Sequence, residues 1–388
     1  MDVTSRADIL RRFDDMPDPR GPNVIHKLPD LVVTAILAVI CGADGWVQVE
    51  LFAKSKRKWL ATFLDFSNGI PSHDTFGRVF AALDPDAFER CFNQWIAELV
   101  KTCKGKLVAI DGKSIRRSFR RCWDKSGMSH LVSAFVRENQ AVFGQLAVED
   151  KSNEIDAIPK LLALLDIRGA VVTLDALGTQ RVIAQTIIEG GGDYVLALKE
   201  NQPTLCQKAE NLMNEAELDR LKSGETTSDG SDGRVRYGFV QTVDGDHGRI
   251  ETRRVLVSDE IEALGKTAGE WKGLSAVVRV DSERDIDGKI SRETRLYITS
   301  IKGTDAERLG DLVRGHWSVE NQLHWQLDVS FNEDQRRIRK GHGAENYSRL
   351  CRMALNLLKR SKKYKVGIQS KRLTAGWDHD YLLGLLSA

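Results

Sequence analysis

The sequence predicts an α/β protein in which helices cover a mixed β-sheet. Short apolar runs of strand-like composition begin near residue 104, at 106–111, 131–136, 141–148, 170–175 and 194–198. Segments with apolar residues at helical spacing separate the last three of these runs from one another. Three strands followed by helix, strand, helix and strand indicate a mixed sheet with helices packed on it.

The residues before the first strand are predicted to form an N-terminal helical domain, 1–103. Val32, Ala35, Ile36 and Val39 recur at helical spacing inside the longest apolar run, 31–43. That run is too short to span a bilayer, which needs about 20 residues, so a buried helix is expected. The segment GIPSHDTFGRVF has a helix start signal, and 86–99 is a further helix. The basic residues Lys54, Lys56, Arg57 and Lys58 of this domain fit either a solvated helix face or a DNA-contacting one.

The remaining chain divides into three predicted parts. A mixed-sheet core covers 104–199 and 301–362, and a β-rich insertion covers 200–300 before the last core helix. Alternating segments in the insertion are typical of antiparallel strands with a solvated face. Residues 363–388 form a basic C-terminal tail with helical character.

Composition excludes several classes of protein. Lys plus Arg is 57 and Asp plus Glu is 55, a formal net charge of +2 that excludes a uniformly basic packaging protein. The six cysteines are scattered without metal-site spacing, which is typical of reduced thiols. With no signal peptide and no membrane span, we expect a cytoplasmic protein without a membrane partner.

Two predicted core strands end in a carboxylate, Asp111 and Asp175. Each acid alone fits a turn former or a helix cap, but ligands bind outside the carboxyl ends of strands in open α/β sheets. A third acid, Glu320, lies among apolar residues on a helix and is predicted to face its packed side. A salt bridge to Arg314 is the alternative. Three carboxylates would bind a hard cation such as Mg²⁺.

Several other residues and motifs have more than one possible role. His316 and His324 flank Glu320 at four-residue spacing, and a transition-metal site there is less favoured than core or phosphate-facing roles. Gly112, Lys113 and Ser114 lack the glycine spacing of a P-loop. Trp271 fits core packing better than stacking on a nucleobase.

Basic residues are concentrated in two places. Residues 336–372 contain thirteen Lys or Arg and one acid, Glu345, a local formal charge of +12. A second cluster begins at Arg116 and Arg117, directly after the first strand acid. Basic groups beside an acidic metal site suit a polyanionic substrate, and phosphates are the natural partner.

At these residues the chain resembles the H-repeat-associated, ISAs-type transposases of the Asp-Asp-Glu group. The likeness covers nearly the whole chain and rests on several motifs in order: GIPSHDTFGRVF, AIDGKSIRRS, HLVSAF, KSNEI, VTLDALGTQ, YVLALKENQ and HWSVENQLHWQLDVSFNEDQRRIRKG. It implies an RNase H-like core in which Asp111, Asp175 and Glu320 are the catalytic acids and metal ligands. A related cut-and-paste group has Tyr, Arg and Lys where this chain has Val313, His316 and Leu327, so no DNA hairpin intermediate is inferred.

The resemblance implies a DNA transposase that uses two Mg²⁺ (or Mn²⁺) ions for phosphodiester hydrolysis and strand transfer. Its partners would be double-stranded element ends and target DNA, bound by a homodimer. An inactive DNA-binding relic and a Mg²⁺ nuclease without strand transfer are the alternatives. The residues expected to contact DNA are Lys113, Arg116, Arg117, His316, His324, Arg336, Arg337, Arg339 and Lys340.

Overall fold

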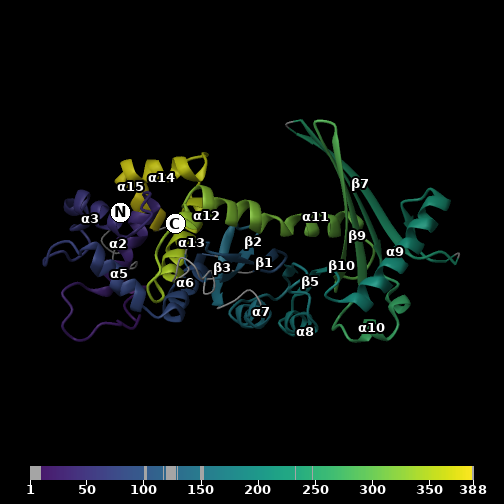
Figure 1. Ribbon diagram of the computed structural model, residues 1–388, viewed down its shortest axis with the longest axis horizontal. Helices are drawn as coiled ribbons and strands as arrows, with labels where there is room; N and C mark the ends of the chain where they lie inside the picture. Colours follow the sequence, from purple (N-terminus) through teal and green to yellow (C-terminus); the bar gives the residue numbers. More distant parts are fainter. Residues whose placement is uncertain are drawn as a thin grey trace. The chain divides into compact units, whose positions relative to one another are not determined.

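The computed structural model describes residues 10–99, 103–116, 118, 128, 130–148, 153–231, 233–246 and 248–386. The chain forms two compact units. The first unit contains Met1–Thr102, Gly112–Asn153 and Val319–Ala388, and the second contains Cys103–Asp111 and Glu154–Ser318. The boundary between them falls inside strand β1 (Leu107–Ser114), and Figure 1 labels many of the elements of both units.

The N-terminal helices of the first unit confirm the helical prediction for this part of the chain. They are α2 (Leu28–Ile40), α3 (Trp46–Ser55), α4 (Arg57–Leu60), α5 (His73–Ala82) and α6 (Pro85–Leu99). Helix α2 is the apolar run seen in the sequence, and it is buried along its whole length. Helix α5 begins after Ser72, whose hydroxyl accepts a hydrogen bond from the Thr75 amide at 3.3 Å.

One carboxylate is buried at the start of α2. Asp30 is 4% exposed, and Oδ2 has no hydrogen-bond partner among the described residues. Burial raises the pKa of Asp30 to about 6, above its usual value near 4. The folded state therefore binds an extra proton between these values, so stability falls as pH rises from about 4 to 6.

We expect Asp30→Asn to stabilise the protein at pH 7, because it removes the cost of ionising a buried carboxyl. After allowance for solvent screening, the gain is about 1–2 kcal/mol. Urea unfolding of the parent and the variant from pH 4 to 7 measures it. The difference between the two should grow as pH rises, and a constant difference would contradict this role of Asp30.

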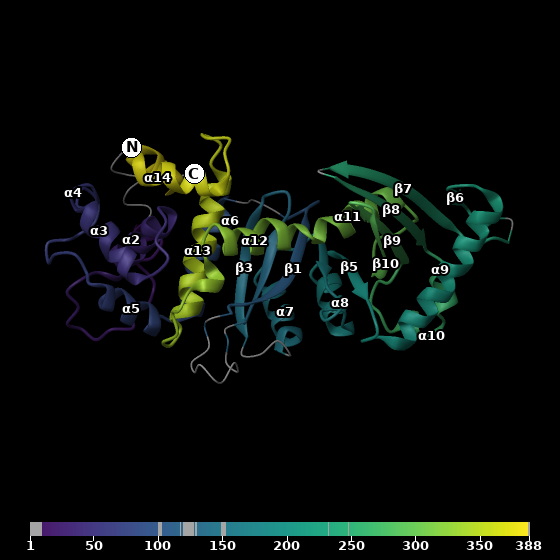
Figure 2. The same cartoon turned by 45° about the horizontal axis from the view of Figure 1, so that its top comes forward.

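Helix α13 (Gly343–Arg360) is the central helix of the first unit. It packs against α2, α5, α6 and β3 and is buried from Gly343 to Leu358. Strands β2 (His130–Val136) and β3 (Ala141–Val148) form an antiparallel pair, and the strand order in this unit is β3-β2-β1. The C-terminal residues form α14 (Ile368–Trp377) and α15 (His379–Leu386), which pack against α13 and are labelled in Figure 1. Figure 2 shows α13 and α14 in a second view.

The second unit contains a mixed sheet with the strand order β1-β4-β5-β10-β9-β8-β7-β6. Strands β1, β4 and β5 are parallel, and the others pair antiparallel. Its strands besides β1 are β4 (Val171–Leu174), β5 (Asp193–Leu198), β6 (Thr227–Ser228), β7 (Tyr237–Asp246), β8 (Arg249–Ser258), β9 (Ala276–Ile286) and β10 (Lys289–Thr299). Its helices are α7 (Glu154–Ala163), α8 (Arg181–Glu189), α9 (Pro203–Ser223), the short η2 (Ile261–Leu264) and α10 (Lys266–Gly269), and α11 (Ala306–His316). The predicted mixed α/β class is thus confirmed.

The β-rich region after β5 extends the sheet of the second unit. Strand β10 pairs antiparallel with β5, with Leu296 opposite Leu198. Valines of β8 and β9 form one hydrophobic core with Leu309 and Leu312 of α11. The predicted antiparallel strands are confirmed, and their inner halves are buried as part of this core. Within the described residues, no helix is long and apolar enough to cross a membrane.

Candidate active site and DNA-binding residues

The register of two parallel strands aligns Asp111 with Asp175. Ile110 of β1 pairs with Leu174 of β4, and each acid is the next residue along its strand direction. Asp111 is half-buried and lies inside β1, because the strand continues three residues further than predicted. Asp175 is exposed, and its Oδ1 accepts a hydrogen bond from the Gly178 amide at 3.1 Å. The two predicted acids thus lie at adjacent positions on neighbouring parallel strands.

The loops after β4 and β5 are joined by hydrogen bonds. The buried Thr179 hydroxyl donates to the Ala197 carbonyl at 2.5 Å, and Asn201 donates to the Ala176 carbonyl at 2.5 Å. Gln202 donates to the Thr179 carbonyl at 3.1 Å. These bonds fix the loop that carries Asp175. The sequence analysis does not identify these side chains. The polar run KENQ, which directly follows an apolar strand, is the signal that could have indicated Asn201 and Gln202.

Glu320 begins a π-helical turn, η3 (Glu320–His324), which continues as α12 (Trp325–Val329). The prediction that Glu320 faces the packed side of its helix was wrong, since its side chain is 57% exposed. A π turn is wider than an α turn, so it places Glu320 out of phase with the buried Leu323 and Leu327. The alternative partner Arg314 instead pairs with Asp244, at 2.6 Å.

His324 is the partner of Glu320 in the first unit. Its Nδ1 lies 2.9 Å from Oε2 of Glu320, and the histidine is 4% exposed. This hydrogen bond lowers the pKa of Glu320, and the nearby charge of Lys113 adds to the effect. A carboxylate and an imidazole in contact can each offer a ligand atom to a metal ion. The local arrangement thus keeps Glu320 ionised and oriented.

Lys113 is buried within the first unit. Only 9% of its side chain is exposed, and its Nζ lies 2.5 Å from Asp328 Oδ1 and 3.7 Å from Glu333 Oε2. It also donates to the His324 carbonyl at 3.3 Å. These contacts join the end of β1 to the turn that carries Glu320. The predicted surface contact of Lys113 with DNA does not agree with this burial.

Glu333 belongs to the same buried network. Burial alone would raise its pKa, but Arg352, Lys113 and the Ser348 hydroxyl together lower it to about 2. Arg352 lies 3.0 Å from Glu333, and both side chains are almost fully buried. The carboxylate therefore stays charged in the core of the first unit, where it stabilises the cations around it.

The structure also shows the burial and contacts of the other candidate residues named from the sequence. His316 is half-buried, with Nδ1 3.0 Å from the Thr173 hydroxyl of β4 in the second unit. Trp271 is 2% exposed, which confirms a core role. Arg116 is 80% exposed and pairs with Asp334 at 3.1 Å, whereas Arg117 lies outside the described residues.

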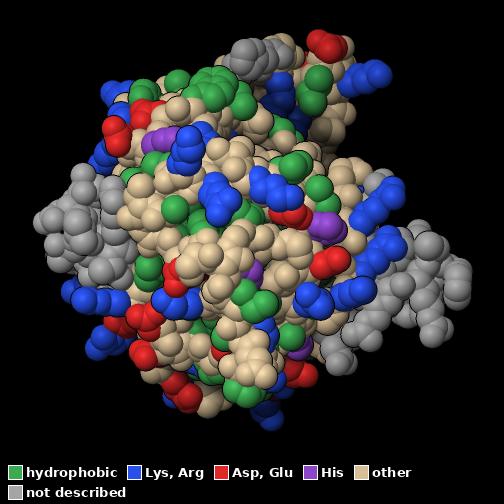
Figure 3. Space-filling model, turned by 90° about the vertical axis from the view of Figure 1, so that its left-hand side faces the viewer, with side chains coloured by type: hydrophobic (Ala, Val, Ile, Leu, Met, Phe, Trp, Pro, Cys, Tyr) green, Lys and Arg blue, Asp and Glu red, His purple; other side chains and the backbone are tan. Residues whose placement is uncertain are grey.

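Only some of the basic side chains in the C-terminal region 336–372 are exposed. Arg336 is 8% exposed, donates to the Phe331 carbonyl at 2.7 Å and lies over the Tyr347 ring at 4.2 Å. The predicted DNA contact at Arg336 does not agree with this packing. Arg349, Arg352, Lys371 and Arg372 are also buried. Arg337 and Lys340 are exposed and Arg339 is half-buried. Figure 3 shows Lys and Arg interspersed with acids on the helical side of the first unit.

Comparison with known families assigns the chain to a class of protein, the transposases with a DDE domain. The family described as "Transposase DDE domain" matches residues 102–357, and "DDE_Tnp_1-associated" matches residues 10–96. The chain belongs to this transposase family. The family and its associated N-terminal segment together cover most of the chain.

Curated relatives match along nearly the whole length. "H repeat-associated putative transposase YhhI" of Escherichia coli K12 is 38% identical over 387 residues, covering 98% of this chain and 97% of that protein. "Putative transposase YncI" of Escherichia coli O157:H7 is 39% identical, covering 98% of this chain and 94% of that protein. "Inactive transposase YbfQ" of Escherichia coli K12 is 48% identical over 18% of this chain and 86% of that protein.

Among solved structures, a piggyBac transposase synaptic complex with hairpin DNA matches at a TM-score of 0.40 and 11% identity. The match covers 98% of this chain and 76% of that one.

Proposed function

We propose that the protein is an active, metal-dependent transposase that cuts the ends of an insertion sequence and joins them to target DNA. The register that sets Asp111 of β1 beside Asp175, the residue after β4, carries this proposal. Two acids at that edge, with a third on a following helix, are the residues that family membership leads one to expect there. Family membership alone would not distinguish an active enzyme from a relic.

The proposed core is RNase H-like. Strands β3, β2, β1, β4 and β5 follow one another in that order, and β1, β4 and β5 are parallel. Asp111 would then lie on the central strand and Asp175 after its neighbour. This topology supports the assignment of the two acids, and the helix with Glu320 supplies the third.

We propose that Asp111, Asp175 and Glu320 hold two Mg²⁺ (or Mn²⁺) ions. Their carboxylate oxygens are the ligands these hard cations prefer, and the low pKa of Glu320 keeps its carboxylate available. Bound ions would activate a water or a 3′-hydroxyl and stabilise the leaving oxygen. Within this scheme, His324 orients Glu320, and Asp111 and Asp175 would supply the other carboxylate ligands.

The proposed phosphate contacts are the exposed Arg116, Arg337 and Lys340, the half-buried Arg339, and His316 beside β4. Arg117, which lies outside the described residues, is proposed as a further phosphate contact. The buried Lys113, Arg336 and His324 would act through packing and orientation instead. The enzyme would work on double-stranded DNA as a homodimer, because two ends must be joined together, and in the bacterial cytoplasm at the nucleoid.

Strand transfer tests the proposal. Labelled duplexes that carry the inverted repeats flanking the gene, already cut at the 3′ ends, are incubated with the protein, Mg²⁺ and a target plasmid. Joined products are expected with Mg²⁺ and none with EDTA. Cutting of the target plasmid without joining would indicate a plain nuclease. Binding without either reaction would indicate an inactive relic.

A further inference from the structure

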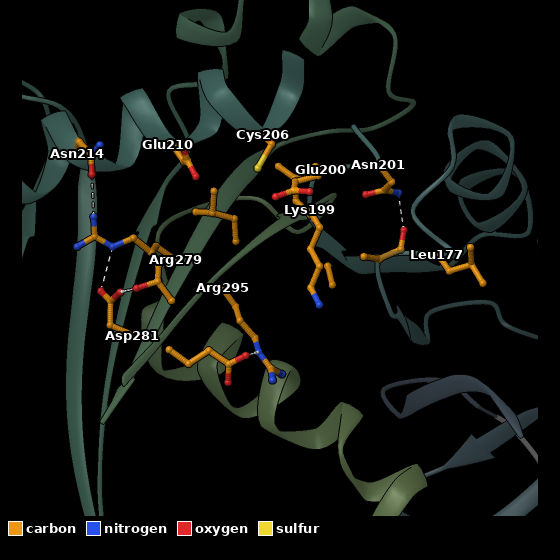
Figure 4. A pocket seen from close by; sticks show the side chains of 16 residues that line it. Leu177, Lys199, Glu200, Asn201, Cys206, Glu210, Asn214, Arg279, Asp281 and Arg295 are labelled. Atoms are coloured by element: carbon orange, nitrogen blue, oxygen red, sulfur yellow. Dashed lines mark hydrogen bonds and ion pairs between the residues drawn. The ribbon is translucent and has the colours of Figure 1, made fainter. Parts of the chain in front are cut away.

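The second unit contains a pocket of about 1050 Å³ beside the loop that follows β5. Figure 4 shows its lining side chains, which come from the loops after β4 and β5, from α9 and from strands β9 and β10. Such a volume lies at the upper end of the range of small-molecule sites, about 300–1,000 Å³, and leaves room for a nucleotide. We call it the β5 pocket.

Lys199 is the cation in this pocket that is available to a ligand. It directly follows β5 and is exposed, and its ammonium has no hydrogen-bond or ion-pair partner among the described residues. Figure 4 shows the side chain pointing into the pocket, away from Glu200 and Glu210 and toward Arg295. Its charge is therefore directed at whatever occupies that half of the β5 pocket.

The two arginines of the pocket are already engaged. Arg279 pairs with Asp281 at 3.0 Å, and Arg295 pairs with Glu293 at 2.7 Å. Arg295 also lies over the ring of Trp317, 4.6 Å from its centroid. These contacts hold the two guanidinium groups in place. Among the described residues, Lys199 is then the cation of the pocket without an ion-pair partner, and the carboxylates of Glu200 and Glu210 line the part of the pocket from which its side chain points away.

The position of Lys199 links the β5 pocket to the proposed reaction. Leu174 of β4 pairs in parallel with Leu196 of β5, so Asp175 and Lys199 follow neighbouring strands at the same sheet edge. The hydrogen bonds from Thr179 and Asn201 join their two loops. A DNA strand held at Asp175 would therefore pass the mouth of the β5 pocket.

The walls suit a DNA backbone rather than a bare anion. Leu177, Leu198 and Leu296 provide apolar surface for a sugar, and Asn201 and Thr294 provide polar groups. We propose that the β5 pocket is a DNA subsite, in which Lys199 binds a backbone phosphate of the strand adjacent to the bond cut at Asp175. This inference rests on the proposed function, and it adds a substrate-binding residue outside the three acids.

Salt dependence of DNA binding tests it. The probe is a fluorescent duplex with the flanking inverted repeat in EDTA, and the variants are Lys199→Gln, Lys199→Arg and Lys222→Gln. Lys222 is a matched control, with a side chain 75% exposed on the last turn of α9. Loss of one phosphate contact should make the plot of log affinity against log salt shallower by about 0.9. We expect this for Lys199→Gln only.

Alkylation of Cys206 gives a second measurement. Cys206 lines the β5 pocket and is half-buried. The duplex should slow its modification several-fold in the parent and in Lys199→Arg, but not in Lys199→Gln. Site-resolved mass spectrometry measures the rate of Cys206 alkylation, and a free mononucleotide serves as the alternative phosphate source. If the mononucleotide protects Cys206 and the duplex does not, the assignment of the pocket to a DNA strand is overturned.

The outcomes separate the two proposals. If the parent does not bind the duplex, the proposed function fails and the subsite fails with it. If the parent binds and Lys199→Gln keeps both the parent slope and the protection of Cys206, the subsite alone is overturned. Because Lys199 is exposed, an unchanged melting temperature is expected for its variants.

Discussion

Glu320→Gln and Asp175→Asn are each expected to reduce Mg²⁺-dependent cleavage of element-end DNA by about a thousandfold or more. That loss corresponds to about 4 kcal/mol of transition-state stabilisation. Both replacements keep the size of the side chain and remove its charge, so they weaken the proposed metal site without a cavity. Glu320 is 57% exposed and Asp175 is exposed, so the fold should not change.

Single-turnover cleavage of the labelled duplex measures the effect, with DNA affinity measured in parallel. Affinity should stay close to the parent value, because phosphate contacts dominate it. Glu307→Gln, an exposed acid of α11, is the matched control and should cleave at the parent rate. Cleavage by Glu320→Gln near the parent rate would assign the third acid to another residue.

Arg349→Met is expected to destabilise the protein by about 3–5 kcal/mol, the largest effect on stability that the structure predicts. Arg349 of α13 pairs with Glu89 of α6 at 2.6 Å, and their side chains are 1% and 4% exposed. Glu89 also accepts the Gln145 amide at 2.9 Å. Burial raises the pKa of Glu89 even beside this arginine, so a lost partner leaves a costly buried carboxylate.

Chemical denaturation measures this loss. The double variant Glu89→Gln with Arg349→Met should recover much of the stability, because the nearly fully buried Glu89 no longer leaves an unpaired charge. Recovery should be incomplete, since Arg349 also pairs with the partly buried Glu345 at 2.8 Å. An exposed pair, Lys363 with Asp378 at 3.3 Å, provides the control, and Lys363→Met should cause no measurable change. An equally stable Arg349→Met variant would show that the buried pair does not hold α13 to α6.

Local patterns in the sequence predicted most elements of the fold. The apolar run in α2, the Ser72 cap and the short strands β2 and β3 need only neighbouring residues to be recognised. The end of β1 was missed, since its last residues are the polar Asp-Gly-Lys-Ser run. Pairing of β10 with β5 was missed because it joins residues about a hundred positions apart.

The candidate site was predicted only in part, because some of its features depend on contacts between residues distant in the sequence. Two strand-end acids follow from local composition, and the parallel register then brings them together. The face of Glu320 depends on a π turn, which apolar spacing does not reveal. Burial of Arg349 and Arg352 depends on Glu89 and Glu333, and a local count of charges does not include such distant partners.

Metal rescue of Asp175→Cys tests the central claim most directly. A thiolate is a poor ligand for Mg²⁺ but is accepted more readily by the softer Mn²⁺. The account predicts that this variant does not cleave the element-end duplex in Mg²⁺ and recovers cleavage in Mn²⁺, whereas Asp175→Ala stays inactive in both. Cleavage by Asp175→Cys in Mg²⁺ at the parent rate, or no recovery in Mn²⁺ while the parent cleaves in both, would contradict a metal-binding Asp175.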